Sequence, residues 1–456
     1  MIQRYNRTGP RYTSYPTALE FKAVETDQEE KSLLSDRDIN KPLSLYLHIP
    51  FCAHVCYYCG CNKVVTKDRS RSESYLALLK KEIDEKTSHL KGNPVVEQMH
   101  WGGGTPTFLS DEQIVDLFNH IKSRFQFSTA DSADFSIEID PRELRPGTLK
   151  LLRQLGFNRT SFGVQDLDEK VQKAVNRVQP ESMIRAVMDE ARELGFRSIN
   201  IDLIYGLPHQ TLESFANTVE TIIDLLPDRL SVFNYAHLPE RFKPQRRINE
   251  EDLPDSQQKL AILGHCIQRL TEADYHYVGM DHFARPDDEL AIAQANKVLH
   301  RNFQGYTTHG DCDLIGFGVS SISQISDQYL QNTPDIKLYE AQVAEGRLPT
   351  AKIINTHQDD IIRRTLIMSL LCHSEVRFVE LNEQFNIDCV EYFADELTAL
   401  QPMVQDKLLE ISDAGIFIQE NGRLLVRNAC MHFDTYLTKL QKAAEEKGER
   451  RFSKAI

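Results

Sequence analysis

The sequence predicts an α/β protein: an open (β/α)6 partial barrel with an N-terminal segment before it and a smaller, mainly helical C-terminal domain after it. Short β-rich runs alternate with longer amphipathic runs between residues 43 and 271, which is typical of a parallel sheet with right-handed crossovers. The tripeptides at 155–157 and 194–196 both read Leu-Gly-Phe, with Gly placed to take the left-handed conformation that ends a helix. Beyond about residue 350 this alternation stops. Six βα units favour the open barrel, although counting alone leaves eight possible.

Each element of the predicted barrel is assigned from its local pattern. The strands are short runs rich in apolar and β-branched residues, expected at 43–49, 96–101, 135–140, 160–164, 198–204 and 229–235. The helices are longer and amphipathic, expected at 74–90, 111–125, 148–155, 181–194, 212–225 and 256–271.

The last part of the chain has a different pattern. Helices are expected at 359–371, 379–385 and 390–400, and short strands at 408–412, 415–419 and 423–427, as in a helical domain with a winged-helix-like hairpin. The mixed charge run at 439–451 predicts a solvated terminal helix. We therefore expect three parts: an N-terminal segment at 1–40, a barrel at 41–350 and a C-terminal helical domain at 351–456.

Composition excludes several classes of protein. The chain has 456 residues, 41% of them hydrophobic, which is enough for a large core and more than one domain. Its formal net charge of −14 argues against nucleic-acid binding, which needs clustered Lys and Arg. The sequence contains neither the roughly 18-residue apolar run of a membrane span nor a signal-peptide pattern. A cytoplasmic protein, monomeric by default, is expected.

Four cysteines lie within ten residues, at Cys52, Cys56, Cys59 and Cys61. The first three read C-x3-C-x2-C, an arrangement that can bind a 4Fe-4S cluster and leave one iron without a protein ligand. A zinc site would show paired C-x2-C units, and a disulfide framework suits short secreted chains rather than this one with nine cysteines. From spacing alone Cys61 could be a fourth cluster ligand. The remaining cysteines are expected to pack as small buried residues: Cys266, Cys312, Cys372, Cys389 and Cys430.

Polar residues and glycines recur where the predicted strands end. In βα barrels ligands bind at the carboxyl ends of the strands, so these positions are candidates for a binding site. They are Gly102–Thr105, Glu138, Gln165, Asp202 and the run at 235–237. The glycines could instead form only a tight turn, and Glu138 could be solvated. Asp202 is the strongest candidate, because it interrupts an apolar run in which an unpaired acid is costly.

Several motifs together resemble a known enzyme family. The stretch from His48 through Lys63 looks like the signature of the radical S-adenosylmethionine (SAM) superfamily. More narrowly, the chain resembles the oxygen-independent coproporphyrinogen III oxidases, also called coproporphyrinogen dehydrogenases. The segments that match lie at 9–17, 100–107, 200–208, 233–237 and 279–285, so the resemblance runs nearly end to end.

The resemblance implies a radical-SAM partial barrel and a step of haem (porphyrin) biosynthesis. Two propionates of coproporphyrinogen III would be oxidatively decarboxylated to vinyls, giving protoporphyrinogen IX, by a 5′-deoxyadenosyl radical made from SAM at the cluster. Two molecules of S-adenosyl-L-methionine and one 4Fe-4S cluster would be the cofactors. A flavodoxin- or ferredoxin-type protein is the expected electron donor.

The resemblance also implies roles for single residues. Cys52, Cys56 and Cys59 would bind the cluster, and Cys61 would be a catalytic residue near the second SAM and the substrate. Residues matching the site of the cluster-bound SAM are Tyr46, Tyr58, Gly103, Glu138 and Ile322. Residues matching the second SAM site are Gly104, Thr105, Gln165, Arg177, Asp202 and Ala236. At position 58 the family more often has Phe, but either ring can stack on adenine.

The substrate carries four carboxylates, so local cations must bind it although the chain is acidic overall. Arg7 and Arg11 are the candidates, in the segment at 1–40 that is expected to cover the substrate on the catalytic barrel. His48 is a further candidate and is also predicted to be catalytic. Ordinary surface charge is the alternative for the two arginines. Two other functions remain to be weighed. A radical-SAM-like haem chaperone would share the barrel and the three-cysteine loop, and an iron–sulfur electron carrier would not need so large a barrel.

Overall fold

In the computed structural model of this chain, residues 2–5, 7 and 9–437 are described. They form two compact units. The first, here called the sheet unit, comprises Phe21–Tyr275 and Asp311–Ile354, and the second, the discontinuous unit, comprises Met1–Glu20, His276–Gly310 and Asn355–Ile456. The predicted boundaries near 40 and 350 assumed contiguous domains and stay a prediction. The helix predicted at 439–451 lies outside the described residues.

The sheet unit is built on a parallel sheet whose strands run in sequence order. The six predicted strands are β2 (Leu43–Ile49), β5 (Val95–Gly103), β7 (Asp134–Ile139), β8 (Arg159–Gln165), β9 (Ser198–Tyr205) and β10 (Arg229–Asn234). Each pairs in parallel with the next. Strand β2 is buried along almost its whole length, as strands covered on both faces are. The predicted order and direction are therefore confirmed.

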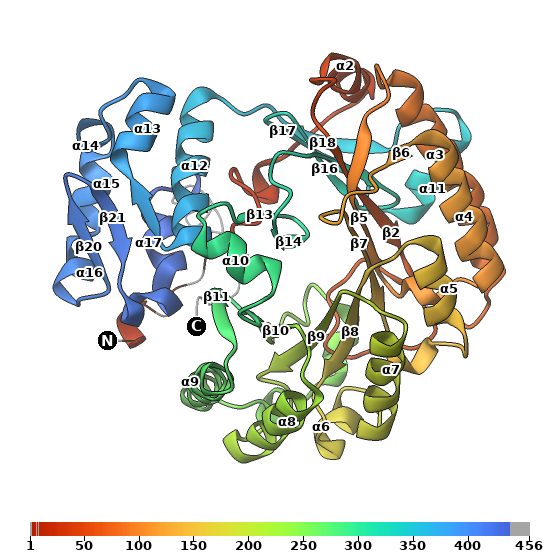
Figure 1. Ribbon diagram of the computed structural model, residues 1–456, viewed down its shortest axis with the longest axis horizontal. Coiled ribbons are helices and arrows are strands. Elements are labelled where there is room, and N and C mark those ends of the chain that lie inside the picture. Colours follow the sequence, from red (N-terminus) through yellow and green to blue (C-terminus); the bar gives the residue numbers. More distant parts are fainter. Residues whose placement is uncertain (1, 6, 8, 438–456) are drawn as a thin grey trace. The chain divides into compact units, whose positions relative to one another are not determined.

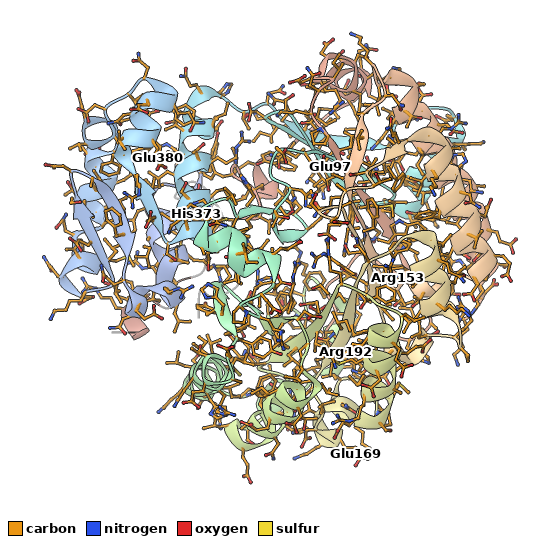
Figure 2. The ribbon with its side chains drawn as sticks, viewed as in Figure 1. Glu97, Arg153, Glu169, Arg192, His373 and Glu380 are labelled. Carbon is orange, nitrogen blue, oxygen red and sulfur yellow. The ribbon has the colours of Figure 1, made fainter. Side chains whose placement is uncertain are left out.

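Helices follow the six strands and lie along the outer side of the sheet, where Figure 1 shows them as one layer. They are α3 (Arg71–His89), α4 (Asp111–Arg124), α5 (Thr148–Leu155), α7 (Glu181–Glu193), α8 (Leu212–Leu225) and α9 (Ser256–Glu272), with the short α6 (Glu169–Ala174) before α7. Arg153 on α5 and Arg192 on α7 are labelled in Figure 2. The alternation that the sequence predicted is thus present in all six units.

The repeated Leu-Gly-Phe tripeptides end α5 and α7 in the same way. Gly156 has φ +111° and Gly195 has φ +74°, both left-handed. The N–H groups of Phe157 and Phe196 donate to the carbonyls of Leu152 and Ala191, at 3.1 Å in each case. Such bonds satisfy carbonyls at the end of a helix, and they turn the buried Phe rings toward the sheet. The prediction from the sequence repeat is confirmed.

The sheet continues beyond β2 through elements that the sequence analysis did not assign. Strand β15 (Asp313–Phe317) pairs in parallel with β2, and antiparallel strands follow it: β16 (Ile322–Ile325), β17 (Gln328–Asn332), β18 (Thr350–Ile354) and β1 (Lys22–Ala23). Helices α2 (Gln28–Asp36) and α11 (Ile336–Ala344) also belong to this unit. Among its described residues β1 and β10, the outermost strands of this order, do not pair with each other, so the sheet is open and not a closed barrel.

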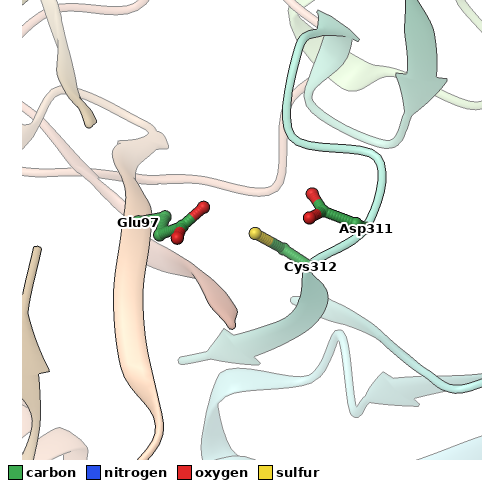
Figure 3. A group of neighbouring side chains, drawn as sticks. All are labelled: Glu97, Asp311 and Cys312. Atoms are coloured by element: carbon green, nitrogen blue, oxygen red, sulfur yellow. The ribbon is translucent and has the colours of Figure 1, made fainter. Parts of the chain in front are cut away.

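A separate group of side chains lies at the amino ends of β5 and β15, the two strands that pair with β2 on either side. Glu97 on β5 and Asp311 and Cys312 before β15 bring one potential ligand atom each to within 4.8 Å of one another. Figure 3 shows the Glu97 carboxylate and the Cys312 sulphur turned toward each other. Burial raises the pKa of the Cys312 thiol, which favours the protonated form. Cys312 is only half-buried, whereas Cys266, Cys372, Cys389 and Cys430 are buried as predicted.

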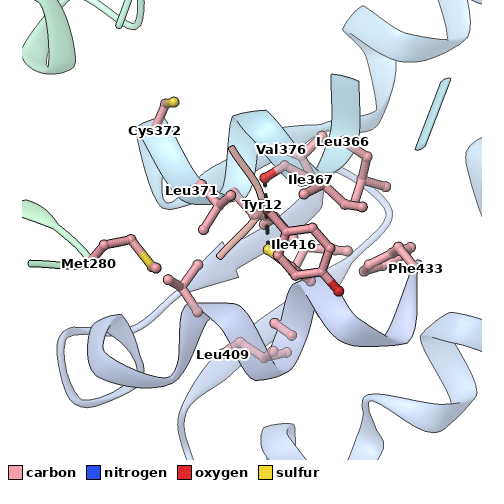
Figure 4. Close-up of a cluster of buried hydrophobic side chains, with 14 of the residues drawn as sticks. Tyr12, Met280, Leu366, Ile367, Leu371, Cys372, Val376, Leu409, Ile416 and Phe433 are labelled. Carbon is pink, nitrogen blue, oxygen red and sulfur yellow. Dashed lines mark hydrogen bonds between the residues drawn. The ribbon is translucent and has the colours of Figure 1, made fainter. Parts of the chain in front are cut away.

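The discontinuous unit joins both ends of the described chain in one core. Tyr12 and Tyr15 are buried among side chains of α12 (Gln358–His373) and α17 (Val426–His432), and Figure 4 shows the Tyr12 ring against this cluster. The Tyr12 hydroxyl donates to Asp434 over 3.0 Å. A Cβ atom at Gly9 would lie 2.5 Å from the Met431 sulphur, so a larger residue there would displace the Met431 side chain. The N-terminal motif therefore has a packing role in this unit.

The C-terminal part of this unit is mainly helical, as predicted. Its further helices are α13 (Phe378–Phe385), α14 (Cys389–Tyr392), α15 (Ala394–Ala399) and α16 (Gln401–Gln405), and β19 (Glu375–Arg377), β20 (Leu409–Ser412) and β21 (Gly415–Ile418) form an antiparallel sheet. Residues 276–310 add the hairpins of β11 (His276–Gly279) with β12 (His282–Ala284) and of β13 (His300–Asn302) with β14 (Gly305–Thr307), and helix α10 (Glu289–Ala295).

Two predictions for this region are wrong in detail. The strand expected at 423–427 is a 3-10 helix, Glu420–Leu425, leading into α17, because a short apolar run fits a buried helix as well as a strand. The single helix expected at 390–400 is interrupted at Phe393, whose ring is fully buried and packs edge-on against Phe433 at 5.4 Å. No helix in the described part of the chain has the length and apolar character that crossing a membrane requires.

Candidate functional site

A cavity of about 230 Å³ lies at the carboxyl ends of the parallel strands. The loop after β2 contributes the four clustered cysteines and Tyr58 to its wall. The end of β5 contributes Gly103, Gly104 and Thr105. Strands β7, β8 and β9 contribute Glu138, Gln165 and Asp202, and Arg177 follows β8 and α6. Most of the predicted site residues therefore lie together in the wall of one cavity, at the strand ends.

The other predicted residues lie outside the wall of this cavity. Tyr46 and His48 are on β2, and Ala236 follows β10, where its carbonyl accepts from Gln245 over 3.2 Å. Ile322 is on β16. Arg7 and Arg11 belong to the discontinuous unit, in which Arg7 is exposed and the guanidinium of Arg11 forms a close ion pair with Asp281.

The cysteine loop is held directly against the end of β5. The N–H groups of Gly104 and Thr105 donate to the carbonyls of Ile49 and Phe51, both over 2.8 Å. A Cβ atom at Gly104 would lie 2.7 Å from the carbonyl carbon of Pro50. Because backbone cannot yield as a flexible side chain can, this close approach requires glycine. The glycine run thus positions the cysteines and is more than a tight turn.

His48 on β2 supports the cysteine loop through hydrogen bonds of its two ring nitrogens. Its Nε2 lies 2.9 Å from the carbonyl oxygen of Asn62, and its Nδ1 lies 3.1 Å from the Tyr46 hydroxyl. A carbonyl only accepts, so Nε2 carries the proton and Nδ1 accepts from Tyr46. Burial lowers the pKa of His48, which agrees with a neutral ring. This geometry positions the far end of the cysteine loop.

Cys59 and Cys61 interact closely at the mouth of the loop. The Cys61 N–H lies 3.4 Å from the Cys59 sulphur, and Lys63 donates to the Cys59 carbonyl over 3.1 Å. A hydrogen bond from the Cys61 side chain lowers the pKa of the Cys59 thiol to about 5. The same side-chain contact raises the pKa of the Cys61 thiol. The thiolate form, which binds metal, is therefore favoured at Cys59, whereas the protonated thiol is favoured at Cys61.

Glu138 faces the cavity between two strands. Its carboxylate accepts from the Gly103 N–H over 3.2 Å and lies 3.3 Å from Nε2 of His100. Although burial opposes ionisation, the hydrogen bond from His100 lowers the pKa of Glu138. The Glu138 side chain is nevertheless 44% exposed, which leaves acceptor capacity free for a ligand.

Asp202 is held by two neighbouring polar side chains. It accepts from Nδ2 of Asn200 over 2.8 Å and from the Ser161 hydroxyl over 3.2 Å. Burial, and next the Glu138 carboxylate, raise the pKa of Asp202 to about 6. Ionised Asp202 is therefore unfavourable for folding in the absence of a ligand, as the apolar sequence around it indicated.

We expect an Asp202→Asn protein to be more stable than the unaltered protein at neutral pH. Between the unfolded pKa near 3.9 and the folded pKa of about 6, only the folded state keeps the proton, so stability falls as pH rises through this window. Asparagine does not ionise, so the variant avoids this loss. We expect it to be more stable by about 1–2 kcal/mol after allowance for partial exposure. The measurement is the thermal midpoint of the ligand-free variant from pH 4 to pH 8.

The advantage of Asp202→Asn should shrink toward pH 4, where the unfolded state is about half protonated, and vanish at lower pH, where both states are protonated. Asp189→Asn, which removes one carboxylate from the exposed face of α7, is the control and should show no such trend. A stability difference for Asp202→Asn that is the same at every pH would contradict the argument.

The sequence analysis missed several residues of this site. Asp140 and Ser161 line the cavity, and Arg142 lies behind Cys56, with Nη2 3.5 Å from the sulphur. Burial opposes ionisation of Asp140, but Arg177 lowers its pKa to about 2. Asp140 and Arg142 stand at the end of β7, so the same strand-end rule could have found them. Ser161 is in the middle of a strand, and nothing in its local sequence marks it.

The fold and the cysteine loop place the chain among radical SAM proteins. The model of the Radical SAM superfamily matches residues 46–222, and the model of the HemN C-terminal domain matches residues 356–425.

Relatives that match this chain over almost its full length identify a narrower family within this class. The chain is 52% identical over 457 residues to the oxygen-independent coproporphyrinogen III oxidase of Pseudomonas aeruginosa, covering 100% of this chain and 98% of that protein. It is 51% identical over 437 residues to the Escherichia coli K12 enzyme of the same name, covering 96% and 95%. The solved structure of coproporphyrinogen III oxidase (HemN) from Escherichia coli superposes with a TM-score of 0.90 at 50% identity, covering 93% of this chain and 97% of that one. The chain therefore belongs to the family of oxygen-independent coproporphyrinogen III oxidases.

Proposed function

We propose that this protein catalyses the oxygen-independent oxidative decarboxylation of two propionates of coproporphyrinogen III to vinyls, giving protoporphyrinogen IX. The observation that supports this most is the cavity, in which three cysteines of C-x3-C-x2-C spacing share one wall with Glu138, Gln165 and Asp202. Membership of the family adds the substrate by analogy. The role is a step of haem biosynthesis in the cytoplasm.

The residues fit a 4Fe-4S cluster bound by Cys52, Cys56 and Cys59. All nine cysteines are free thiols, and these three line the same cavity. The low pKa of Cys59 favours a thiolate there. Burial raises the pKa of Cys52 to about 12, and the Thr105 hydroxyl, 3.5 Å from the Cys52 sulphur, opposes this rise. When bound, the reduced cluster supplies the electron that cleaves SAM into methionine and a 5′-deoxyadenosyl radical.

The wall of the cavity also fits a polar organic ligand such as SAM. The side-chain oxygen of Gln165 and Nε of Arg177 are buried, and no described residue hydrogen-bonds to either atom. Gln165 also has φ +73°, a left-handed conformation that is unusual for glutamine. Such unsatisfied buried atoms are costly unless a ligand completes their hydrogen bonds. Tyr58 and Glu138 would hold the adenine of the cluster-bound SAM, with Gly103, Tyr46 and Ile322 completing the set.

We infer a second SAM bound by Gly104, Thr105, Gln165, Arg177, Asp202 and Ala236. Asp202 offers acceptors for ribose hydroxyls. Arg177 would bind a carboxylate, although its guanidinium already donates to Asp140 over 3.0 Å and to the Gly163 carbonyl. Cys61 would act as the catalytic thiol beside this molecule.

Substrate carboxylates would be bound by local cations. Arg7 is exposed and thus available, whereas Arg11 would have to share its guanidinium with Asp281. His48 is proposed to act by positioning the cysteine loop, since both its ring nitrogens are engaged. A monomer that receives electrons from a flavodoxin- or ferredoxin-type protein completes the proposal.

The test is turnover by the anaerobically reconstituted protein. With coproporphyrinogen III, SAM and a one-electron reductant, we expect protoporphyrinogen IX, two molecules of CO2 per substrate, and 5′-deoxyadenosine with methionine. Omitting SAM should abolish CO2 release. Stable haem binding without CO2 release would contradict the proposal and favour a haem chaperone.

A further inference from the structure

The sulphur of Cys56 accepts hydrogen bonds from two arginines. Nη2 of Arg142 lies 3.5 Å from it, and Nη1 of Arg177 lies 3.4 Å from it. Both distances are within the usual range for N–H donation to sulphur. Cys56 is itself buried, so water does not compete strongly for this sulphur. Two positive groups therefore face one predicted cluster ligand.

A single carboxylate orients both guanidinium groups. Asp140 accepts from Nε and Nη2 of Arg142 over 3.0 Å and 2.7 Å, a two-point contact that fixes the plane of the guanidinium. It also accepts from Nη1 of Arg177 over 3.0 Å. The exposed fraction of the side chain is 10% for Asp140, 11% for Arg142 and 7% for Arg177. Two cations and one anion leave a net charge of +1 beside the sulphur.

Arg142 is also tied to the segment that supports the cysteine loop. Its Nη1 donates to the Asn176 carbonyl over 3.3 Å, and Nδ2 of Asn176 donates to the Val55 carbonyl over 2.8 Å. The N–H of Tyr57 donates to the Val175 carbonyl over 3.0 Å. Arg142 is thus held in place on the side of Cys56 that faces the protein.

The two arginines differ in their access to a ligand. Arg177 lines the cavity, whereas Arg142 is absent from the described residues that form its wall. Arg177 can therefore contact SAM directly, whereas Arg142 can act on the chemistry only through the residues that it contacts, among them the sulphur of Cys56 and the Asp140 carboxylate.

We propose that Arg142, oriented by Asp140, is a positioning residue that raises the reduction potential of the cluster through the sulphur of Cys56. One-electron reduction adds a negative charge to the cluster and its thiolates. A nearby cation and an N–H···S bond stabilise that charge more than they stabilise the oxidised state. The electron comes from an external one-electron reductant, and no bond to Arg142 forms or breaks. The inference rests on Cys56 being a cluster ligand, as proposed above.

The test is a redox titration of the cluster by electron paramagnetic resonance, on anaerobically reconstituted protein without SAM or substrate and with dithionite as reductant. For Arg142→Gln we expect the ratio of reduced to oxidised cluster at a fixed potential to fall about tenfold, equivalent to about 59 mV for one electron. Arg142→Lys keeps the charge but loses the two-point contact, so a smaller fall of about threefold is expected. Arg153→Gln on α5 removes the same charge from a residue that donates to the Gly195 carbonyl and is not part of the cavity wall, and it should change nothing (Figure 2).

An unchanged midpoint potential in Arg142→Gln at full iron content would overturn the inference. If Arg142→Gln binds no cluster, Arg142→Lys decides the question, and a midpoint equal to that of the unaltered protein overturns it. Iron analysis of Cys56→Ser separates this inference from the proposed function. Four irons in Cys56→Ser would refute the ligand assignment, whereas iron loss there with no shift in the Arg142 variants refutes only the role of Arg142.

Discussion

A Cys61→Ser protein is expected to keep a normal four-iron cluster and to lose decarboxylation by about 100- to 10,000-fold, the range that one proton-transfer group contributes. Serine keeps the backbone N–H that lies 3.4 Å from the Cys59 sulphur, so the support of Cys59 survives. It replaces the protonated thiol that is proposed to be catalytic by a hydroxyl, which is a much weaker acid than a thiol. The variant therefore separates cluster binding from catalysis.

The measurements for Cys61→Ser are iron content, the spectrum of the reduced cluster and CO2 release from coproporphyrinogen III. Cys59→Ser is the comparison that should lose the cluster. Cys312→Ser, which changes a thiol at the opposite, amino end of the strands, should leave both readouts unchanged. If Cys61→Ser lost iron as Cys59→Ser does, Cys61 would be a fourth ligand and the cluster would have no open iron.

A Lys86→Met protein is expected to lose about 3–5 kcal/mol of stability. Lys86 on α3 is 0% exposed, and its ammonium lies 3.0 Å from both Glu30 and Glu82 and donates to the Gly316 carbonyl over 2.7 Å. Although burial opposes it, Glu30 and Glu82 raise the pKa of Lys86, so the ammonium is charged throughout the neutral range. Methionine fills similar space but leaves two buried carboxylates without their cation.

The measurement for Lys86→Met is urea unfolding of the ligand-free protein at pH 7. Lys150→Met, on the exposed face of α5, is the matched control and should change stability by less than about 0.5 kcal/mol. Adding Glu82→Gln to Lys86→Met should recover part of the loss, because one uncompensated charge is removed. A raised folded pKa keeps the contribution of Lys86 constant below the unfolded value near 10.4, so the loss should be equal at pH 7 and pH 9. A loss below about 1 kcal/mol would contradict the argument.

Glu82, one of the two glutamate partners of Lys86, takes part in a wider hydrogen-bond network in this core. Glu82 accepts from the Tyr339 hydroxyl and from Nδ2 of Asn332, both over 2.7 Å, and from the N–H of Gly318 over 2.8 Å. These bonds connect α2, α3, β15, β17 and α11. The network therefore fixes the added strands to the predicted barrel.

The fold was largely predictable where local pattern and packing agree. Strand β2 and helices α5 and α8 have the predicted bounds, because a strand buried on both faces is an unbroken apolar run and helix ends carry their own signals. The strands β15 to β18 went unassigned because they are short and lack such signals. The apolar run at 423–427 was assigned to the wrong element, since only tertiary packing distinguishes a short buried strand from a helix.

The candidate site was predictable in part, for a different reason. Cysteine spacing indicated the cluster, and strand ends indicated Gly102–Thr105, Glu138 and Asp202. The contact of Arg142 with Cys56 joins residues 86 positions apart, and no local pattern records it. Ile322 entered only through family resemblance, because an apolar side chain near a ligand has no chemical signature in sequence.

The discontinuous unit has a consequence for how the chain is made on the ribosome. Tyr12 donates its hydrogen bond to a residue 422 positions later, so its partner is synthesised long after it. At bacterial or eukaryotic elongation rates, roughly 20–80 s separate the two residues. The whole sheet unit leaves the ribosome during that interval, before the C-terminal partners of Tyr12 exist. The order of synthesis therefore allows the cysteine-bearing unit to fold first. The segment that contains Tyr12 then associates last with its C-terminal partners.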